Sequence, residues 1–151
     1  MMLKNYYPLV SFLVAVIIAQ GVKPFIMYPK TKQFKINYAF NSGGYPSSHS
    51  ASVTSLAMAI GYKEGFDSSF FAICFCLTVV VIFDAFNVRW YAGRNIKLTK
   101  QLVEDLQDFI DETDPIYNEK LKDVLGHTKL EIVTGTLLGI AIATILYLLW
   151  R

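Results

Sequence analysis

The clearest membrane span in this chain of 151 residues is LEIVTGTLLGIAIATILYLLW, residues Leu130–Trp150. A helix of about 20 predominantly apolar residues is long enough to cross a hydrocarbon core of roughly 30 Å. Trp150 and Arg151 close the run with side chains that favour the membrane–water interface. The chain is therefore expected to be an integral membrane protein.

Three further apolar runs lie upstream, at Leu9–Ala19, Ser50–Tyr62 and Ser69–Val88. The composition is 54% hydrophobic and 17% charged, and most of the charges fall between the runs. We predict an all-α, polytopic membrane helical bundle of about four transmembrane helices, forming one domain over residues 1–151. The first run could instead belong to a signal peptide, because Lys4 precedes it. No cleavage site follows at the right distance, so we expect the run to be retained.

The segments between the runs differ in length and charge. Residues 21–49 are predicted to form a long basic loop, and residues 63–68 a tight turn. Residues 89–129 form the largest polar region, called here the polar insert, in which apolar residues recur at helical spacing. We expect an amphipathic helix there, lying on the bundle or at the membrane surface. Its apolar face would comprise Leu102, Leu106, Phe109 and Ile110, and Pro115 would end it or follow its end.

Neither a nucleic-acid partner nor a disulfide is expected. The net charge is only +2, and no basic stripe interleaved with aromatic residues is present. The two cysteines, Cys74 and Cys76, lie two positions apart inside an apolar run. A helix would point them in different directions, so they are expected to be packing or lipid-facing residues.

The two histidines of the chain both lie where a helix is about to begin. His49 follows Gly43-Gly44 and Pro46, and Ser47 is a suitable N-cap that would place His49 in the first helical turn. Unpaired backbone N–H groups and the helix dipole favour an anion at such a position. The alternative is that this segment only starts a helix.

The second histidine, His127, has a carboxylate four residues later, Glu131, so the two can touch on one face of a helix. A carboxylate bonded to one imidazole nitrogen leaves the other nitrogen free as a nucleophile. The alternative is that Thr128 and Glu131 form a capping box, in which Glu131 serves only the helix end.

The helices that follow the two histidines carry matching faces of small residues. The faces are Ala51, Ser55 and Ala59 after His49, and Gly135, Gly139 and Ala143 after His127. Small residues allow transmembrane helices to approach closely. With four spans, the second and fourth helices would run parallel, and packing on these faces would bring both histidines together. Each face could instead pack against another helix.

Three cations could complete an anion site at the same end of the bundle: Lys23, Lys30 and Arg89. Arginine suits bidentate phosphate binding and lysine acts as a point charge, although each could simply snorkel to the interface. Asp84 lies inside an apolar run, where a carboxylate needs a partner, and a buried pair with Arg89 would supply one. Such a pair could orient Arg89 or be purely structural.

These motifs resemble the three signatures of the superfamily of type-2 phosphatidic acid phosphatases and vanadium haloperoxidases. Lys23-x6-Lys30 is similar to Lys-x6-Arg-Pro, and Pro46-Ser47-Ser48-His49 to Pro-Ser-Gly-His. Val88-Arg89 and His127-x3-Glu131 are similar to Ser-Arg-x5-His-x3-Asp split by an insertion. Over nearly its whole length the chain resembles more closely a small divergent membrane branch of that superfamily.

The resemblance implies an integral-membrane lipid phosphate phosphatase that uses neither a metal ion nor a cofactor. His127 would attack phosphorus and form a phosphohistidine, Glu131 would hold its ring, and His49 would protonate the departing alcohol. The remaining residues implied are the phosphate ligands Lys23, Lys30, Ser47, Ser48 and Arg89, with Asp84 in support.

Two non-catalytic functions stay open beside the phosphatase. One is a lipid-phosphate binder or carrier, and the other is a structural membrane subunit whose polar insert docks a partner. Two histidines and a carboxylate favour catalysis, because binding alone would need only the cations. The expected partner is a phospholipid or another lipid phosphate in the membrane, and self-association into a homo-oligomer is left open.

The distribution of Lys and Arg predicts which side of the membrane holds the site. With four spans, residues 21–49 and 89–129 lie on one side with most of the cations, and the other side has only Lys4, Lys63 and Arg151. The imbalance persists when Lys23, Lys30 and Arg89 are left out. Lys and Arg favour the cytoplasmic side, so we expect a multi-pass protein of a bacterial plasma membrane whose site faces the cytosol and whose termini lie outside.

Overall fold

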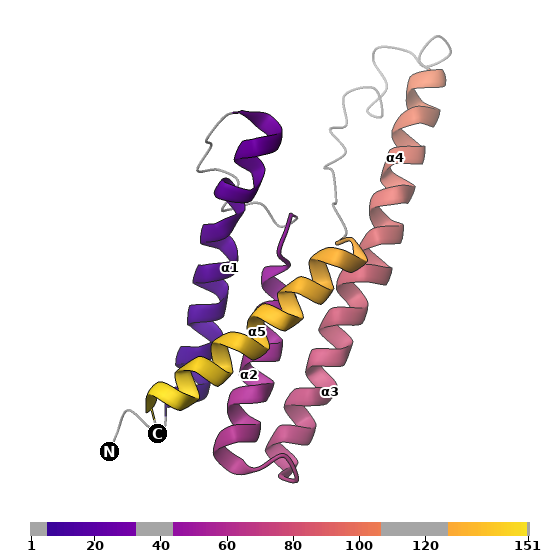
Figure 1. Ribbon diagram of the computed structural model, residues 1–151. Helices are drawn as coiled ribbons and strands as arrows, with labels where there is room; N and C mark the ends of the chain where they lie inside the picture. Colours follow the sequence, from indigo (N-terminus) through magenta and orange to yellow (C-terminus); the bar gives the residue numbers. More distant parts are fainter. Residues whose placement is uncertain (1–5, 33–43, 107–126, 151) are drawn as a thin grey trace.

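The computed structural model describes residues 6–32, 44–106 and 127–150, and these are helical apart from short turns (Figure 1). The helices are α1 (Tyr7–Thr31), α2 (Ser48–Glu64), α3 (Ser69–Phe83), α4 (Arg89–Asp105) and α5 (Lys129–Trp150). A π-helical turn, η3 (Asp84–Val88), joins α3 to α4 without a break. The prediction of an all-α helical membrane bundle is confirmed.

Three helices in the described residues are long and apolar enough to cross a membrane: Tyr7–Pro29, Ser69–Asp105 and Lys129–Trp150. The region predicted as a further span, Ser50–Tyr62, lies in α2, which has 17 residues. Most of its small and hydroxyl-bearing side chains are buried inside the bundle. A helix surrounded by other helices needs close packing rather than lipid-facing hydrophobicity, which explains its mixed composition.

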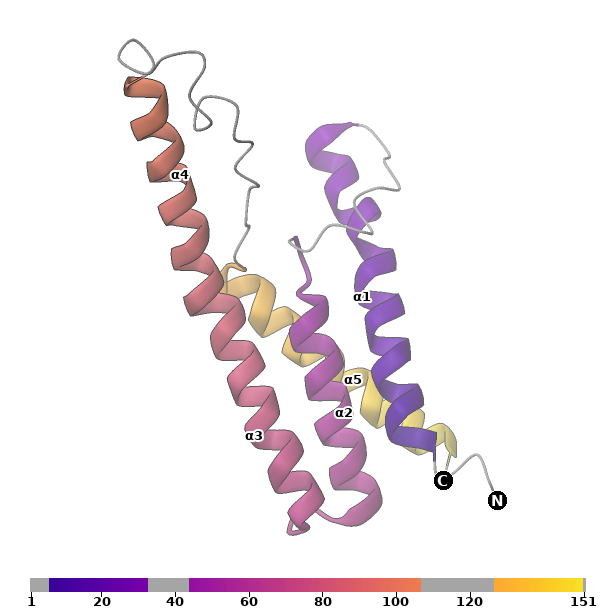
Figure 2. The ribbon, with the colours of Figure 1, turned by 180° about the vertical axis from the view of Figure 1, so that it is seen from behind.

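Helix α2 packs against α1 on one side, α3 on another and α5 across its face (Figures 1 and 2). Two buried clusters hold these helices together. One contains Ala15, Ala19, Ala51 and Ile142, and the other contains Tyr7, Ala59 and Ala143. Alanine dominates both clusters, so the helix backbones lie close together and dispersion contacts between them are dense.

The contact between α2 and α5 depends on two glycines. A Cβ atom at Gly135 would collide with the carbonyl oxygen of Ser47, and one at Gly139 with the carbonyl oxygen of Ala51. Farther along, Ala59 and Ala143 pack together in the second cluster. Both helices therefore run in the same direction, and the predicted packing of the two small-residue faces is confirmed.

The predicted basic loop at residues 21–49 is wrong over its first part, because α1 continues as a helix to Thr31. Pro24 and Pro29 lie inside this helix. Proline interrupts the hydrogen-bond ladder, but membrane helices tolerate it because neighbouring groups re-satisfy the freed backbone. Lys23 is also fully buried rather than part of a solvated loop.

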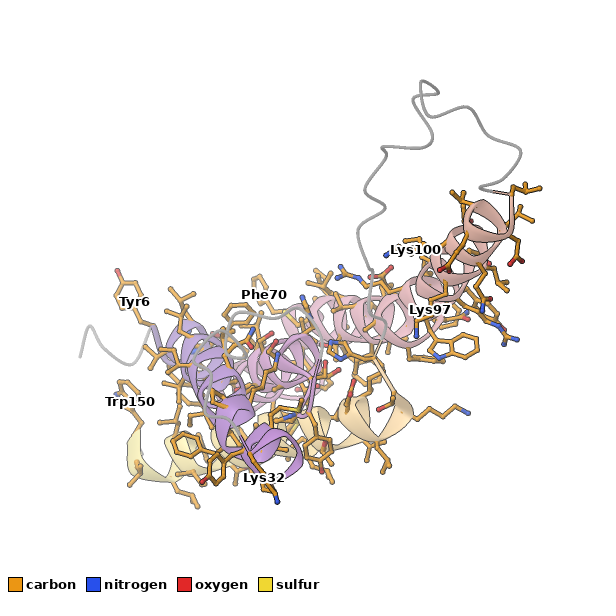
Figure 3. The ribbon with its side chains drawn as sticks, turned by 90° about the horizontal axis from the view of Figure 1, so that it is seen from above. Tyr6, Lys32, Phe70, Lys97, Lys100 and Trp150 are labelled. Atoms are coloured by element: carbon orange, nitrogen blue, oxygen red, sulfur yellow. The ribbon has the colours of Figure 1, made fainter. Side chains whose placement is uncertain are left out.

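The polar insert also differs from expectation in its first part. Its helix, α4, continues α3 through η3 and projects away from the other helices instead of lying on the bundle (Figure 1). From above, α4 with Lys97 and Lys100 lies to one side of the remaining helices (Figure 3). The apolar side chains of Leu102 and Leu106 are exposed. Phe109, Ile110 and Pro115 lie outside the described residues.

The continuous helix Ser69–Asp105 has 37 residues. At 1.5 Å per residue it is about 55 Å long, which exceeds a hydrocarbon core of roughly 30 Å. Its apolar part is α3, and α4 is the polar continuation beyond it. Within α3, Cys74 and Cys76 are free thiols, as predicted.

Candidate active site

The two histidines meet at one end of the bundle, where α2 and α5 begin. The ring centroids of His49 and His127 are 5.9 Å apart, with an angle of 61° between the ring planes. The backbone N–H of Ser47 donates to the carbonyl oxygen of Glu131 at 2.9 Å and joins the two helix starts directly. Parallel packing of α2 and α5 therefore places both imidazoles in one site.

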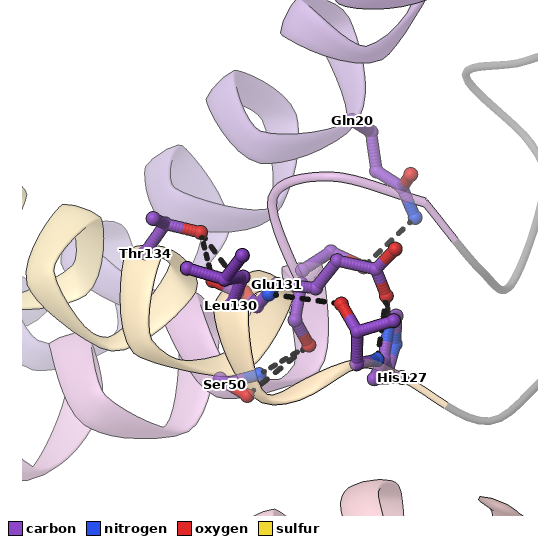
Figure 4. Close-up of polar contacts among 9 residues, drawn as sticks. Gln20, Ser50, His127, Leu130, Glu131 and Thr134 are labelled. Atoms are coloured by element: carbon purple, nitrogen blue, oxygen red, sulfur yellow. Dashed lines mark hydrogen bonds and ion pairs between the residues drawn. The ribbon is translucent and has the colours of Figure 1, made fainter.

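Glu131 contacts the ring of His127 and also caps α5 (Figure 4). Its Oε2 lies 3.0 Å from Nδ1 of His127 and accepts the backbone N–H of Thr128 at 3.1 Å. The backbone N–H of Glu131 donates to Oγ1 of Thr128 at 3.3 Å, which completes a capping box. The contact between His127 and Glu131 and the capping box, which the sequence offered as alternatives, are both present.

The second ring nitrogen of His127 has no partner in the described part of the chain. The side chain is 2% exposed, and Nε2 is buried without a hydrogen bond. With Nδ1 bonded to the carboxylate, Nε2 is the nitrogen that can carry the lone pair of a neutral imidazole. A buried acceptor of this kind is costly unless a ligand or substrate satisfies it.

The backbone of His127 is held by the π-helical turn. Its N–H donates to the carbonyl oxygen of Ala85 at 3.1 Å. A π-helical turn shifts the hydrogen-bond pattern to residues five apart, and such turns are frequent at functional sites. Nothing in the sequence analysis identified η3, because apolar periodicity does not distinguish a π turn from an α turn.

The start of α2 is built from buried hydroxyl groups. Ser47 is the N-cap as predicted, and its Oγ accepts the backbone N–H of Ser50 at 3.3 Å. Ser48 is 5% exposed, and its Oγ accepts a hydrogen bond from Nε2 of Gln20 on α1 at 3.1 Å. Gln20 was not identified from the sequence, and only its place one helical turn before Lys23 could have suggested it.

Lys23 approaches this end of the bundle from α1. Its side chain is 1% exposed and passes beneath the turn before α2, because a Cβ atom at Gly44 would lie 3.9 Å from its Cδ. Gly44 itself has a φ of +100°, which other residues rarely adopt. Lys30 lies two turns farther along the same face of α1, and its side chain is outside the described residues.

Arg89 and Asp84 form an ion pair across η3. Nε of Arg89 donates to Oδ2 of Asp84 at 2.8 Å. The two side chains are 45% and 42% exposed, so the expectation that this pair is buried is wrong. The reason is that α3 and α4 form one continuous helix at the edge of the bundle (Figure 2).

Burial and nearby charges lower the pKa of His49. His49 lies outside the three apolar spans, and burial is the main cause that lowers its pKa below the ordinary value of about 6.5. Electrostatic interactions with Arg89, His127 and Lys23 lower the pKa of His49 further, and the Asp84 carboxylate opposes them. These groups are thus close enough to interact electrostatically at one site.

A pocket of about 470 Å³ opens beside His127. Its lining residues are Phe86, Asn87, Trp90, Tyr91, His127, Thr128 and Lys129. Phe86 and Asn87 come from η3, Trp90 and Tyr91 from the first turn of α4, and the other three residues from the start of α5 and the two positions before it. The pocket leaves space for a bound molecule next to His127, and sequence analysis missed its aromatic residues because no motif contains them.

This arrangement brings together an imidazole oriented by a carboxylate, a second imidazole, and cations near a helix N-terminus, which are groups of the kind that sites for phosphoryl transfer use. In the residues that the structure describes, no group of three side chains suited to holding a metal ion occurs.

Comparison with known proteins agrees with a membrane location. The sequence model of a family described as "Divergent PAP2 family" matches residues 4–142. The chain is also similar to the "Uncharacterized membrane protein YuiD" of Bacillus subtilis (strain 168), with 35% identity over 153 residues that cover 97% of each chain. No solved structure matches the chain.

Proposed function

Because the chain belongs to the divergent PAP2 family of membrane proteins, we propose that it is a lipid phosphate phosphatase that works through a phosphohistidine, without a metal ion. The observation that carries this proposal is the state of His127. One ring nitrogen is hydrogen-bonded to Glu131, and in the described part of the chain the other is buried without a partner. The ring of a second histidine, His49, lies beside it. A site that only bound phosphate would not need an oriented, unpartnered imidazole nitrogen.

In the first half-reaction, Nε2 of His127 attacks the phosphorus atom. A bond forms between Nε2 and phosphorus while the bond from phosphorus to the ester oxygen breaks. Glu131 stabilises the positive charge that develops on the imidazole, because its Oε2 lies 3.0 Å from Nδ1. His49 donates a proton to the departing alcohol oxygen.

In the second half-reaction, water attacks the phosphohistidine. His49, now neutral, accepts a proton from the water as the bond between Nε2 and phosphorus breaks. Inorganic phosphate is released, His127 regains its lone pair, and His49 is again ready to donate. The 5.9 Å between the ring centroids leaves both imidazoles close to one phosphoryl group.

The phosphoryl oxygens are held by Lys23, Arg89 and the hydroxyl-lined start of α2, with Lys30 contributing from the same face of α1. Lys23 and Arg89 both act electrostatically on His49, which supports their proximity to the anion. Asp84 orients Arg89 through the 2.8 Å ion pair. Ser47 and Ser48 supply hydroxyl donors, and the first turn of α2 supplies backbone N–H groups.

The proposed substrate is a phospholipid or another lipid phosphate in the plasma membrane of a bacterium, with its phosphate on the cytosolic side. The position of the site at the end of the apolar helices supports a lipid substrate, because a phosphate there lies at headgroup depth. The excess of Lys and Arg at this end supports a cytosolic orientation.

The direct test uses the purified chain in detergent. It should release inorganic phosphate from at least one member of a panel of lipid phosphates in the presence of a chelator. A phosphoprotein that is labile to acid and stable to base should accumulate during turnover, as expected for phosphohistidine. Tight binding of a lipid phosphate without any release would contradict the phosphatase and favour a carrier.

A further inference from the structure

The side chain of Gln20 is the one contact of the Ser48 hydroxyl group in the described residues. Its Nε2 donates to Oγ of Ser48 at 3.1 Å (Figure 4). Its Oε1 is buried and has no hydrogen-bond partner within residues 6–32, 44–106 and 127–150. Neither the sequence motifs nor the reaction described above gives Gln20 a role. It lies on α1, three residues before the buried Lys23 and on the same face.

Unsatisfied polar atoms are concentrated at this site. Three buried side-chain N or O atoms of the described residues lack a hydrogen bond: Oε1 of Gln20, Oγ1 of Thr54 and Nε2 of His127. Two of the three belong to residues that contact Ser48 or His49 directly. Buried groups of this kind are rare in folded proteins and indicate a position where a ligand completes the hydrogen bonds.

The direction of the bond between Gln20 and Ser48 decides what the hydroxyl group can do. A serine hydroxyl has one proton to donate and can accept two hydrogen bonds. Since Oγ of Ser48 accepts the amide N–H of Gln20, its own proton remains available for an anion. If Ser48 donated to Oε1 of Gln20 instead, it would present only a lone pair to the phosphate and repel it.

We propose that Gln20 is a positioning residue of the phosphoryl site, which holds the Ser48 hydroxyl as a donor to a phosphoryl oxygen. This inference rests on the proposed function, because it requires a phosphoryl group in front of Ser48. The side chain of Gln20 reaches the site from α1, and the proposed phosphate ligands Ser48 and Arg89 belong to α2 and α4. Glutamine fits this role because its amide group donates without adding charge beside the anion.

Two substitutions separate the donor from the size of the side chain. Gln20→Met keeps the length but removes the donor, and Gln20→Glu replaces it by a charged acceptor. We expect Gln20→Met to weaken binding of inorganic phosphate by about fivefold to tenfold, the loss typical of one hydrogen bond. Gln20→Glu should weaken it by roughly 100-fold, because a carboxylate a few ångströms away repels the anion.

The decisive experiment is a double-mutant cycle with Ser48→Ala, in which binding of inorganic phosphate to the detergent-solubilised chain is followed by ³¹P NMR titration. If Gln20 acts through Ser48, Gln20→Met should have no further effect in the Ser48→Ala background. Equal losses in both backgrounds would overturn the inference, since they would show that Gln20 acts on the fold in general. Gln101→Met, at an exposed glutamine of α4, is the matched control and should bind phosphate normally.

The same titration separates this inference from the proposed function. A wild-type chain that binds phosphate but hydrolyses no lipid phosphate overturns the phosphatase and leaves the cycle to decide the role of Gln20. A wild-type chain that binds no phosphate overturns both. Melting temperatures of Gln20→Met and Gln101→Met should agree within a few degrees, so that a loss of binding is not a loss of folding.

Discussion

At the residue scale, the chemistry of the site depends on how Glu131 is held. One oxygen atom, Oε2, is the hydrogen-bond partner of both Nδ1 of His127 and the backbone N–H of Thr128. The hydrogen bond to Thr128 fixes the position of the carboxylate, and the carboxylate in turn fixes the orientation of the His127 ring. Helix capping and the orientation of the His127 ring are therefore coupled through a single atom.

Two substitutions should distinguish these roles of Glu131. Glu131→Gln keeps an oxygen that can accept both bonds but removes the charge, so phosphate release should fall about 10- to 100-fold with little change in melting temperature. Thr128→Ala removes one bond of the capping box and should cost about 1 kcal/mol of stability while lowering turnover less than about threefold. Steady-state kinetics measure turnover, and thermal unfolding in detergent measures stability. A loss of stability with unchanged turnover in Glu131→Gln would mean that Glu131 acts only as a cap.

Replacement of His127 tests the nucleophile directly. His127→Ala removes the atom that bonds to phosphorus, so phosphate release should fall at least about 1,000-fold and no phosphoprotein should form. The chain should still insert into membranes, because the helix contacts of α5 involve Gly135 and Gly139 instead. Turnover near the wild-type level would exclude the phosphohistidine.

The pH dependence of activity should report His49. As the general acid, His49 must be protonated in the free enzyme, and its pKa lies below the ordinary 6.5. As pH rises through this lowered pKa the acid is lost, so kcat/KM for a lipid phosphate should fall at a pH below about 6.5.

His49→Ala is the matched variant for this pH dependence. The kcat/KM of this variant should no longer fall as pH rises through the pKa of His49. Its activity should be far less impaired with a nitrophenyl phosphate than with a lipid phosphate, because the nitrophenyl leaving group needs no proton. Equal impairment with both kinds of ester would indicate that His49 binds the phosphate and does not act as an acid.

At the scale of elements, the site exists because α2 and α5 approach closely over a short distance. The glycines at positions 135 and 139 of α5 lie against the backbone of α2, so the helix starts and their histidines come together. The π-helical turn η3 brings a third element to the same point through the bond from His127 to the carbonyl oxygen of Ala85. Substitutions that alter these contacts should therefore change activity, although they replace none of the proposed site residues.

Gly139→Ala tests the close approach of the helices. Its new methyl group would collide with the carbonyl oxygen of Ala51, so α5 must shift and we expect a loss of about 1–3 kcal/mol together with reduced turnover. Gly21→Ala is the matched control, because a Cβ atom there has no other atom within 4 Å. The control should be neutral or stabilise α1 by up to about 1 kcal/mol, since alanine favours the helix. Equal melting temperatures of the two variants would contradict the packing argument.

At the scale of the whole molecule, the start of α1 and the end of α5 lie at the end of the bundle away from the starts of α2 and α5 (Figure 1). The ring centroids of Tyr7, at the start of α1, and Trp150, at the end of α5, are 6.2 Å apart. The turn between α2 and α3 lies at the same end as Tyr7 and Trp150. Helix α2 runs through the bundle between these two ends.

Cysteine labelling should reveal which side of the membrane this is. In a chain with Cys74 and Cys76 replaced, single cysteines are introduced at Lys32, near the site, and at Asp67, in the turn at the opposite end. Both positions are exposed. With the site in the cytosol, a membrane-impermeant thiol reagent applied to intact cells should label Asp67→Cys and spare Lys32→Cys. A cysteine at Asn118, outside the described residues, should also be spared, and the reverse pattern would place the site outside the cell.

The sequence by itself determined the parts of this protein that depend on local spacing. Apolar runs predicted the all-α membrane bundle, and an interval of four residues predicted the contact between His127 and Glu131. The spacing of small residues after each histidine predicted which faces of α2 and α5 meet. Helical periodicity fixes all of these, because it sets which side chains share a face regardless of the rest of the chain.

The tertiary structure alone decided the contacts between elements distant in sequence. It extended α1 through Pro24 and Pro29 to Thr31, made the first part of the polar insert, as far as Asp105, a continuation of α3, and placed Gln20 against Ser48. Among the residues that the structure describes, it also left Nε2 of His127 without a hydrogen-bond partner, and it exposed the pair of Asp84 and Arg89. Each of these outcomes depends on the angle and depth at which whole helices pack, which are set jointly by many side chains and cannot be inferred from the spacing within one segment.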